Sequence, residues 1–209
     1  MKITCISDTH TKSIAKIPDS DVLVFAGDFS IRGYEQDFMD FILKLEKIEN
    51  VKEKVIIAGN HDFCMERQIK TEDAIRMINN PHIHYLNETG VKIDGYNFWG
   101  SPWTPWFHDW AFNMAPGTER LRWNKIPDDT DVLITHGPPF GILDRTNSGK
   151  NVGCLDLLDR IKTIKPKCHI FGHIHEAYGI THLEGVTYVN ACQLNLAYDY
   201  VNKPITIIV

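Results

Sequence analysis

Short, nearly continuous runs of Val, Ile, Leu and Phe recur along the chain, separated by more polar stretches. Such runs are typical of strands that are covered on both faces of a sheet, because neither face is left to water. The pattern predicts seven strands, at residues 2–7, 21–26, 54–58, 131–135, 168–171, 187–190 and 205–209.

Between these runs, apolar residues recur with helical spacing. The segment 34–50 is predicted to be a helix with one apolar stripe, and 71–79 and 154–164 are shorter helix candidates. The apolar stripe of the first helix consists of Phe38, Phe41, Ile42, Leu45 and Ile48. The pair Asp94-Gly95, flanked by apolar runs, predicts a two-residue hairpin turn. Together these elements predict an α/β protein (α+β by some schemes), in which a mixed-sheet sandwich is covered by helices.

The length of 209 residues suits one domain with a sizeable core, and no linker or internal repeat divides the chain. We therefore expect a single domain over residues 1–209.

Five of the apolar runs are followed at once by a cluster of Asp, His, Asn and Gly. These clusters are Asp8-Thr-His10, Gly27-Asp28, Gly59-Asn60-His61-Asp62, Thr135-His136-Gly137 and Gly172-His173-Ile-His175. In layered α/β proteins, ligands gather where strands reach their carboxyl ends. We therefore expect the five clusters to meet at one site, although they are far apart in sequence.

The residue types in these clusters indicate metal binding. A lone His or Asp at a strand end is more often a cap or a surface residue, but half of the ten histidines fall in these motifs. In an extended segment, residues i and i+2 point to the same side, so Asp8 with His10, and His173 with His175, are each expected to face one cavity. The glycines before Asp28, Asn60 and His173 permit a sharp turn or a close approach to bound ions.

The series D-x-H, G-D, G-N-H-D, T-H and G-H-x-H resembles the calcineurin-like metallophosphoesterase superfamily over nearly the whole chain. The stretches at 100–103, 135–139, 171–178, 188–191 and 201–204 resemble its metallophosphoesterase-domain-containing branch, which is related to class III cyclic-nucleotide phosphodiesterases. The resemblance implies the calcineurin-like fold, in which two packed mixed β-sheets are flanked by helices.

The resemblance also implies which residues hold two metal ions. One ion would be held by Asp8, His10 and His175, the other by Asn60, His136 and His173, and Asp28 would bridge them. His61 would act as general acid, with Asp62 orienting its ring. The alternative for this last pair is a purely structural role at a strand end.

Two divalent ions about 3.5–4 Å apart can clamp a phosphoryl group and lower the pKa of a bridging water, which then attacks as hydroxide. The mixed nitrogen and oxygen ligands favour a first-row transition metal. We expect manganese, with iron, zinc, cobalt and nickel as alternatives. Counted with Asp8, Asp28 and a hydroxide, the two ions leave one formal positive charge. That charge suits a phosphodiester monoanion, but it would also attract a monoester.

All five tryptophans lie between residues 99 and 123, in a segment interrupted by prolines. Aromatic rings beside a metal site can stack a nucleobase. They can equally cover a sheet edge or form a dimer contact, since aromatic side chains dominate cores and interfaces. We assign most of these rings to packing and keep Trp103 and His108 as substrate-binding candidates.

Composition narrows the class of partner. The 22 basic and 27 acidic side chains give a formal charge of -5, which argues against non-specific nucleic-acid binding and against an anionic membrane surface. No apolar run has membrane-spanning length, the start of the chain is too short for a signal-peptide core, and the five cysteines form no C-x-x-C pair, so we expect a cytoplasmic protein.

The leading hypothesis is a dinuclear-metal phosphodiesterase acting on small nucleotide-like diesters, with cyclic nucleotides as natural candidates. The alternatives are a phosphomonoesterase, such as a nucleotidase or protein phosphatase, and a non-catalytic scaffold of the same fold. The sequence leaves the oligomeric state open.

Overall fold

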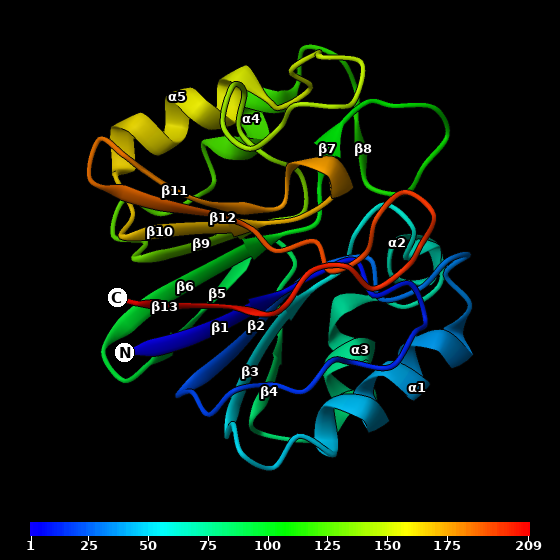
Figure 1. Cartoon of the computed structure of the whole chain (residues 1–209). Helices are drawn as coiled ribbons and strands as arrows, with labels where there is room; N and C mark the ends of the chain where they lie inside the picture. Colours follow the sequence, from blue (N-terminus) through cyan, green and yellow to red (C-terminus); the bar gives the residue numbers. More distant parts are fainter.

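A computed structural model, which describes residues 1–209, contains two mixed β-sheets that pack face to face (Figure 1). The first sheet has the strand order β13-β1-β2-β3-β4. Its strands are β1 (Lys2–Ile6), β2 (Val22–Ala26), β3 (Glu53–Ile57), β4 (Ile83–Tyr85) and β13 (Ile205–Ile208). The first four run parallel, and β13 pairs antiparallel with β1. The carboxyl ends of β1, β2 and β3 therefore lie at one edge of the sheet.

The second sheet has the order β11-β12-β10-β9-β6-β5. Its strands are β5 (Thr89–Ile93), β6 (Tyr96–Ser101), β9 (Val132–Thr135), β10 (Cys168–Phe171), β11 (Gly179–Leu183) and β12 (Val186–Asn190). The four central strands are parallel, and the two outermost strands pair antiparallel with their neighbours. A bridge from Ser7 to Cys192 joins the sheets just beyond β1 and β12, so their carboxyl ends meet.

Helices cover the outer face of each sheet (Figure 1). The first sheet is covered by α1 (Glu35–Glu46), α2 (Phe63–Arg67) and α3 (Thr71–Ile78), and the second by α4 (Glu119–Trp123) and α5 (Leu155–Ile164). The remaining elements are the 3₁₀ helix η1 (His175–Ala177) and the two-stranded pair β7 (Thr104–Pro105) and β8 (Asn113–Met114). None of the helices combines the length and the apolar character that a membrane span requires.

The hydrophobic pattern predicted the main elements. All seven expected strands form, and four residues of the predicted stripe of α1 are buried, namely Phe38, Phe41, Ile42 and Leu45. The helix ends at Glu46 rather than near residue 50, and Ile48 packs against the core from the turn that follows. At the predicted hairpin, Asp94 and Gly95 have φ of 47° and 87°, as a type I′ turn requires. The pattern missed α2, α4, β4, β7 and β8, which are too short to show a period, and β11, which is mostly exposed and lacks a continuous apolar run.

Candidate metal centre

The five strand-end clusters meet where the two sheets join. Asp8 follows β1, Asp28 follows β2 and Asn60 follows β3, all from the first sheet. His136 follows β9, His173 follows β10 and His175 begins η1, all from the second sheet. Each sheet thus contributes part of the centre, because parallel strands bring their carboxyl ends to a common edge.

One group of candidate ligands consists of Asp8, His10 and His175. His175 Nε2 lies 3.4 Å from Asp8 Oδ1 and 3.3 Å from His10 Nε2. The potential ligand atoms of all three side chains lie within 4.8 Å of one another. This spacing suits donor atoms that surround one ion.

A second group lies beside it. His136 Nε2 is 2.8 Å from Asn60 Oδ1, and the rings of His136 and His173 have centroids 5.0 Å apart. Asp28 stands between the groups, because its Oδ2 is 3.4 Å from His136 Nε2 and 3.8 Å from His10 Nε2. The structure therefore brings together all seven positions expected to bind metal, with Asp28 in the bridging place.

The orientation of the imidazole rings fits metal ligation. Nδ1 of His10, His136 and His175 lies 2.9, 2.9 and 3.1 Å from the carbonyl oxygens of Ser30, Ala26 and Asn195, respectively. A carbonyl only accepts hydrogen bonds, so Nδ1 carries the proton and the lone pair of Nε2 faces the centre. Metal-binding histidines are commonly held in this way.

The backbone at the ligands is unusual. Asp8, His10, Asp28 and His173 all have left-handed φ, between 43° and 70°. The prediction that the pairs converge through extended segments is therefore wrong in its reason, because left-handed turns and η1 aim these side chains. Residues other than glycine adopt such angles at an energetic cost, and backbone strain of this kind is typical of functional sites.

Two glycines allow the clusters to approach so closely. A Cβ on Gly59 would lie 2.2 Å from Asp28 Oδ1, and a Cβ on Gly172 would lie 2.1 Å from Asp8 Oδ2. Any larger residue would displace the carboxylates that the centre requires. This bears out the expectation that glycines permit close approach.

The centre places two carboxylates where they are buried from solvent. Asp8 and Asp28 are almost fully buried, and their ion-pair partners are histidines only. Burial raises the pKa of a carboxyl, but the hydrogen bond and charge of His175 hold the pKa of Asp8 well below its usual range. Burial also disfavours a charged His136, yet the Asp28 carboxylate raises its pKa to about 9. Buried carboxylates of this kind need cations, which two metal ions would supply.

His61 lies at the edge of the centre nearest His10. Its ring centroid is 4.6 Å from that of His10 and 4.2 Å from that of Trp110. Its Nδ1 lies 2.8 Å from the carbonyl oxygen of Ile31, so Nε2 is left for the cavity, while its backbone N–H donates to Asp28 Oδ1. The side chain therefore lies beside the candidate metal ligands.

The expected role of Asp62 needs correction. Its carboxylate accepts hydrogen bonds from the backbone N–H groups of Asp28, Ser30 and Gly59, at 2.8–3.0 Å, and from the Ser30 hydroxyl. The ring of His61 is held by Ile31 instead. Asp62 therefore joins the loops that carry Asp28 and Asn60 and does not orient the general-acid candidate, because a turn directs its side chain inward.

The two substrate candidates, Trp103 and His108, are not among the rings that pack against His61. Trp103 is a packing residue, with the Arg122 guanidinium 3.6 Å from its ring and Phe112 edge-on at 5.5 Å. His108 is exposed beside Phe107, and its role stays a prediction. Sequence reasoning missed Trp110, which stacks on His61, and the exposed pair Trp106 and Phe107. Five tryptophans in one segment marked this region as a candidate for substrate contacts, but the orientation of each side chain depends on the tertiary fold.

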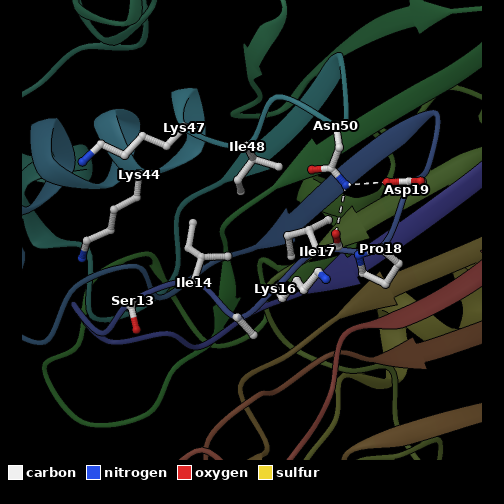
Figure 2. Close-up of a pocket in the computed structure, with 11 residues that line it drawn as sticks. Ser13, Ile14, Lys16, Ile17, Pro18, Asp19, Lys44, Lys47, Ile48 and Asn50 are labelled. Carbon is white, nitrogen blue, oxygen red and sulfur yellow. Dashed lines mark hydrogen bonds between the residues drawn. The ribbon is translucent and has the colours of Figure 1, made fainter.

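A cavity of about 760 Å³ lies elsewhere, between residues 13–19 and the end of α1 (Figure 2). Ile14, Ile17 and Ile48 line it together with Lys44 and Lys47, but none of the candidate site residues does. Lys44 donates to backbone carbonyls of the neighbouring loop. The cavity carries none of the chemistry described above.

The fold is shared with solved structures at low sequence identity. One crystal structure matches with a TM-score of 0.71 and 18% identity, over 90% of this chain and 89% of its own. GAP50, the anchor in the inner membrane complex of Plasmodium, matches with a TM-score of 0.50 and 10% identity, over 92% and 71%. These likenesses concern the fold alone.

Sequence relatives are more specific. Metallophosphoesterase domain-containing protein 1 of Homo sapiens is 35% identical over 229 residues, which cover 99% of this chain and 70% of the human protein. A UPF0046 protein of Caenorhabditis elegans is 36% identical over 219 residues, covering 98% and 74%. The family model described as Calcineurin-like phosphoesterase matches residues 1–177, which contain every candidate ligand. The chain therefore belongs to the calcineurin-like phosphoesterase family, and its converging ligands are those of a metal-dependent phosphoesterase.

Proposed function

We propose that the protein is a dinuclear-metal phosphodiesterase that hydrolyses small nucleotide-like diesters, with cyclic nucleotides as natural candidates. The proposal rests above all on Asp28, whose Oδ2 faces both His10 Nε2 and His136 Nε2. A carboxylate between two ligand groups is what a pair of ions needs in order to share one phosphoryl group. When bound, the ions supply Lewis acidity and a nucleophile at neutral pH.

The charges around the centre favour a diester. Neither the ion pairs of Asp8 and Asp28 nor the cavity beside His173 includes a lysine or arginine. The metal ions would therefore be the main positive charge that a substrate meets. A diester monoanion matches the single formal positive charge left by the ligand set, whereas a monoester dianion would remain partly uncompensated.

His61 supplies the proton in this proposal. With Nδ1–H bound to Ile31, the charged ring would present Nε2–H to the oxygen that leaves phosphorus. The ring of Trp110 packs against that of His61 at a tilt of 32°. Asp62 contributes by holding the loops of Asp28 and Asn60 together.

We further propose manganese as the native metal, with iron, zinc, cobalt and nickel as alternatives, because the ligands mix imidazole nitrogen with oxygen. A reducing compartment such as the cytoplasm fits the five cysteines, all of which are free and buried.

The deciding experiment compares bis(p-nitrophenyl) phosphate with p-nitrophenyl phosphate at neutral pH and equal manganese loading. We expect a higher kcat/KM for the diester. A higher kcat/KM for the monoester would establish the phosphomonoesterase alternative. No turnover of either substrate, by protein shown to contain two ions, would favour the scaffold alternative.

A further inference from the structure

A mostly apolar cavity of about 330 Å³ opens beside His173. We call it the ester pocket. Its lining residues are Thr104, Pro105, Trp106, Phe107, Gly137, Pro138, Thr146, Val152, His173, Ile174, Glu176 and Leu196. They come from the loop around β7, from the segment after β9, from the loop before α5, from the segment after β10 that includes η1, and from the segment after β12. The volume lies at the lower end of the range for small-molecule sites, which are typically apolar with a few polar groups.

The ester pocket adjoins the metal centre at the flank formed by His173. His173 belongs to its wall, and His173 packs against His136 in the second ligand group. His61, by contrast, stands at another flank beside His10, with Trp110 next to it, and neither lines the pocket. A group bonded to a phosphate at the centre can therefore extend in two directions, toward the proton donor or into the pocket.

We propose that the ester pocket binds the organic group that stays on phosphorus, while the leaving oxygen faces His61. This inference rests on the proposed phosphodiesterase function and specifies its substrate. In the reaction, the oxygen of water forms a bond to phosphorus and a proton of that water passes to solvent. The bond from phosphorus to the leaving oxygen breaks, and His61 protonates that oxygen and then regains a proton from solvent. The product in the pocket is a monoester of the retained group.

The lining determines which groups fit. Trp106 and Phe107 are each 56% exposed, and Val152 and Leu196 are also exposed, so the pocket presents apolar surface that a ligand would cover. Covering apolar surface of this kind with a flat apolar or aromatic ring lowers the free energy, and so favours binding. We therefore expect an aromatic or heteroaromatic retained group.

Glu176 gives the pocket a second selective feature. It provides the only carboxylate of the lining, and no lysine or arginine accompanies it. Its Oε1 accepts a hydrogen bond from the backbone N–H of Asn147, which fixes the side chain. Glu176 would repel a retained group that carries a further negative charge and would accept a hydrogen bond from a ring N–H.

This arrangement accounts for a preference for diesters by means other than charge. A monoester whose only organic group leaves toward His61 has nothing to place in the ester pocket. A diester fills both flanks and gains the binding free energy of the retained group.

The test holds the leaving group constant and varies the retained group. Methyl p-nitrophenyl phosphate and phenyl p-nitrophenyl phosphate both release p-nitrophenolate, so their kcat/KM ratio reports the pocket. We expect the phenyl diester to be preferred by about 10-fold or more. The variants Trp106→Ala and Leu196→Ala should lower that ratio, chiefly by lowering kcat/KM for the phenyl diester. Leu183→Ala, on exposed β11, is the matched control.

A binding measurement makes the result independent of turnover. Calorimetry on manganese-loaded protein should show tighter binding of phenylphosphonate than of methylphosphonate, and Trp106→Ala should remove the difference. Glu176→Gln should raise kcat/KM for 4-carboxyphenyl p-nitrophenyl phosphate relative to the phenyl diester.

The possible failures are distinct. Equal kcat/KM for the methyl and phenyl diesters, or equal affinity for the two phosphonates, would overturn the ester pocket even if diesters outpace monoesters. A faster monoester would overturn the proposed function, and the phosphonate affinities would then still decide whether the pocket binds an aromatic group.

Discussion

The two ligand groups of the metal centre differ in how firmly their side chains are held. In the first group, Nδ1 of His10 and of His175 each has a carbonyl partner, and the ring of Tyr198 lies edge-on to both imidazoles. Asp8 accepts hydrogen bonds from the backbone N–H of His173 and from the thiol of Cys192. In the second group, His136 is held in the same way, but the ring of His173 has no hydrogen bond.

In the proposed dinuclear centre, this difference would give the two ions unequal tasks. Ligands that are held in place before binding lose less entropy, so the first group should bind its ion more tightly. His173, which is oriented by packing alone and forms part of the ester pocket, can adjust when a substrate enters. The first ligand group would hold its ion in a fixed position, and the second ligand group would contact the retained part of the substrate.

The largest effect should follow from removing the group that both halves share. Asp28→Ala leaves each group without its common carboxylate, so we expect activity to fall to background and both ions to bind more weakly. Metal content measured by elemental analysis, alongside turnover of bis(p-nitrophenyl) phosphate, tests this. A wild-type stoichiometry of one ion per chain with full activity would refute the dinuclear centre.

A smaller loss should follow from His61→Asn, which touches none of the seven ligands. General acid catalysis contributes about 10²–10⁴-fold, so a loss of that order is expected on a cyclic nucleotide, whose leaving alkoxide needs a proton. The loss should be much smaller on bis(p-nitrophenyl) phosphate, because nitrophenolate leaves with little help.

Metal content serves as the control for this variant, and both substrates are assayed on the same preparation. Equal losses on the two substrates, with both ions present and chemistry rate-limiting, would mean that His61 positions the phosphate and does not protonate the leaving oxygen.

The comparison of the two groups can be sharpened at Tyr198. Its ring lies 4.7 Å from that of His10 and belongs to the segment whose Asn195 carbonyl holds His175. Tyr198→Ala should lower the binding affinity for one of the two ions by about 10-fold and leave the affinity for the other nearly unchanged. Stepwise metal titration by calorimetry measures both affinities.

Tyr200→Ala, in the same segment, is the matched control for loosening of that segment. If Tyr198→Ala weakens both ions equally, or if Tyr200→Ala has the same effect, the proposed inequality between the two groups is wrong.

The last prediction concerns stability beneath the second group. His169, fully buried on β10, has Nε2 2.7 Å from the hydroxyl of Thr135 on β9, and so ties together the strands that carry His173 and His136. Burial lowers the pKa of His169 to about 3. A depressed histidine pKa means that the unfolded chain takes up a proton below its ordinary pKa of about 6.5 while the folded chain does not.

The contribution of His169 is therefore present above pH 6.5 and is lost as the pH falls from 6.5 toward 3. As the pH falls through that interval, we expect protonation of this residue in the unfolded chain to lower the free energy of unfolding by up to about 1.4 kcal/mol per pH unit. In His169→Gln the slope between pH 6 and pH 4.5 should be shallower by that order. Urea denaturation measures it, with His182→Gln on exposed β11 as the control. Identical slopes in wild type and His169→Gln would show that this buried ring does not govern acid stability.

Much of the centre could be predicted from the chain itself. Continuous apolar runs indicated the strands, since a strand covered on both faces needs apolar residues at every position. The clusters that follow them indicated the ligands, because parallel strands place their carboxyl ends at one edge wherever the chain returns. Asp8, Asn60 and His136 could therefore be grouped although up to 128 residues separate them.

Tertiary structure decided what those residues touch. Asp62 follows His61 in sequence, but a tight turn directs it to the backbone N–H groups of Asp28 and Gly59 rather than to the neighbouring ring. Trp103 and Trp106 look alike in sequence, yet one packs beneath Arg122 and the other lines the ester pocket. Apolar periodicity and strand order are local properties that sequence records. The direction of a side chain in an irregular loop depends on segments packed against it from elsewhere in the chain, and these contacts exist only after folding.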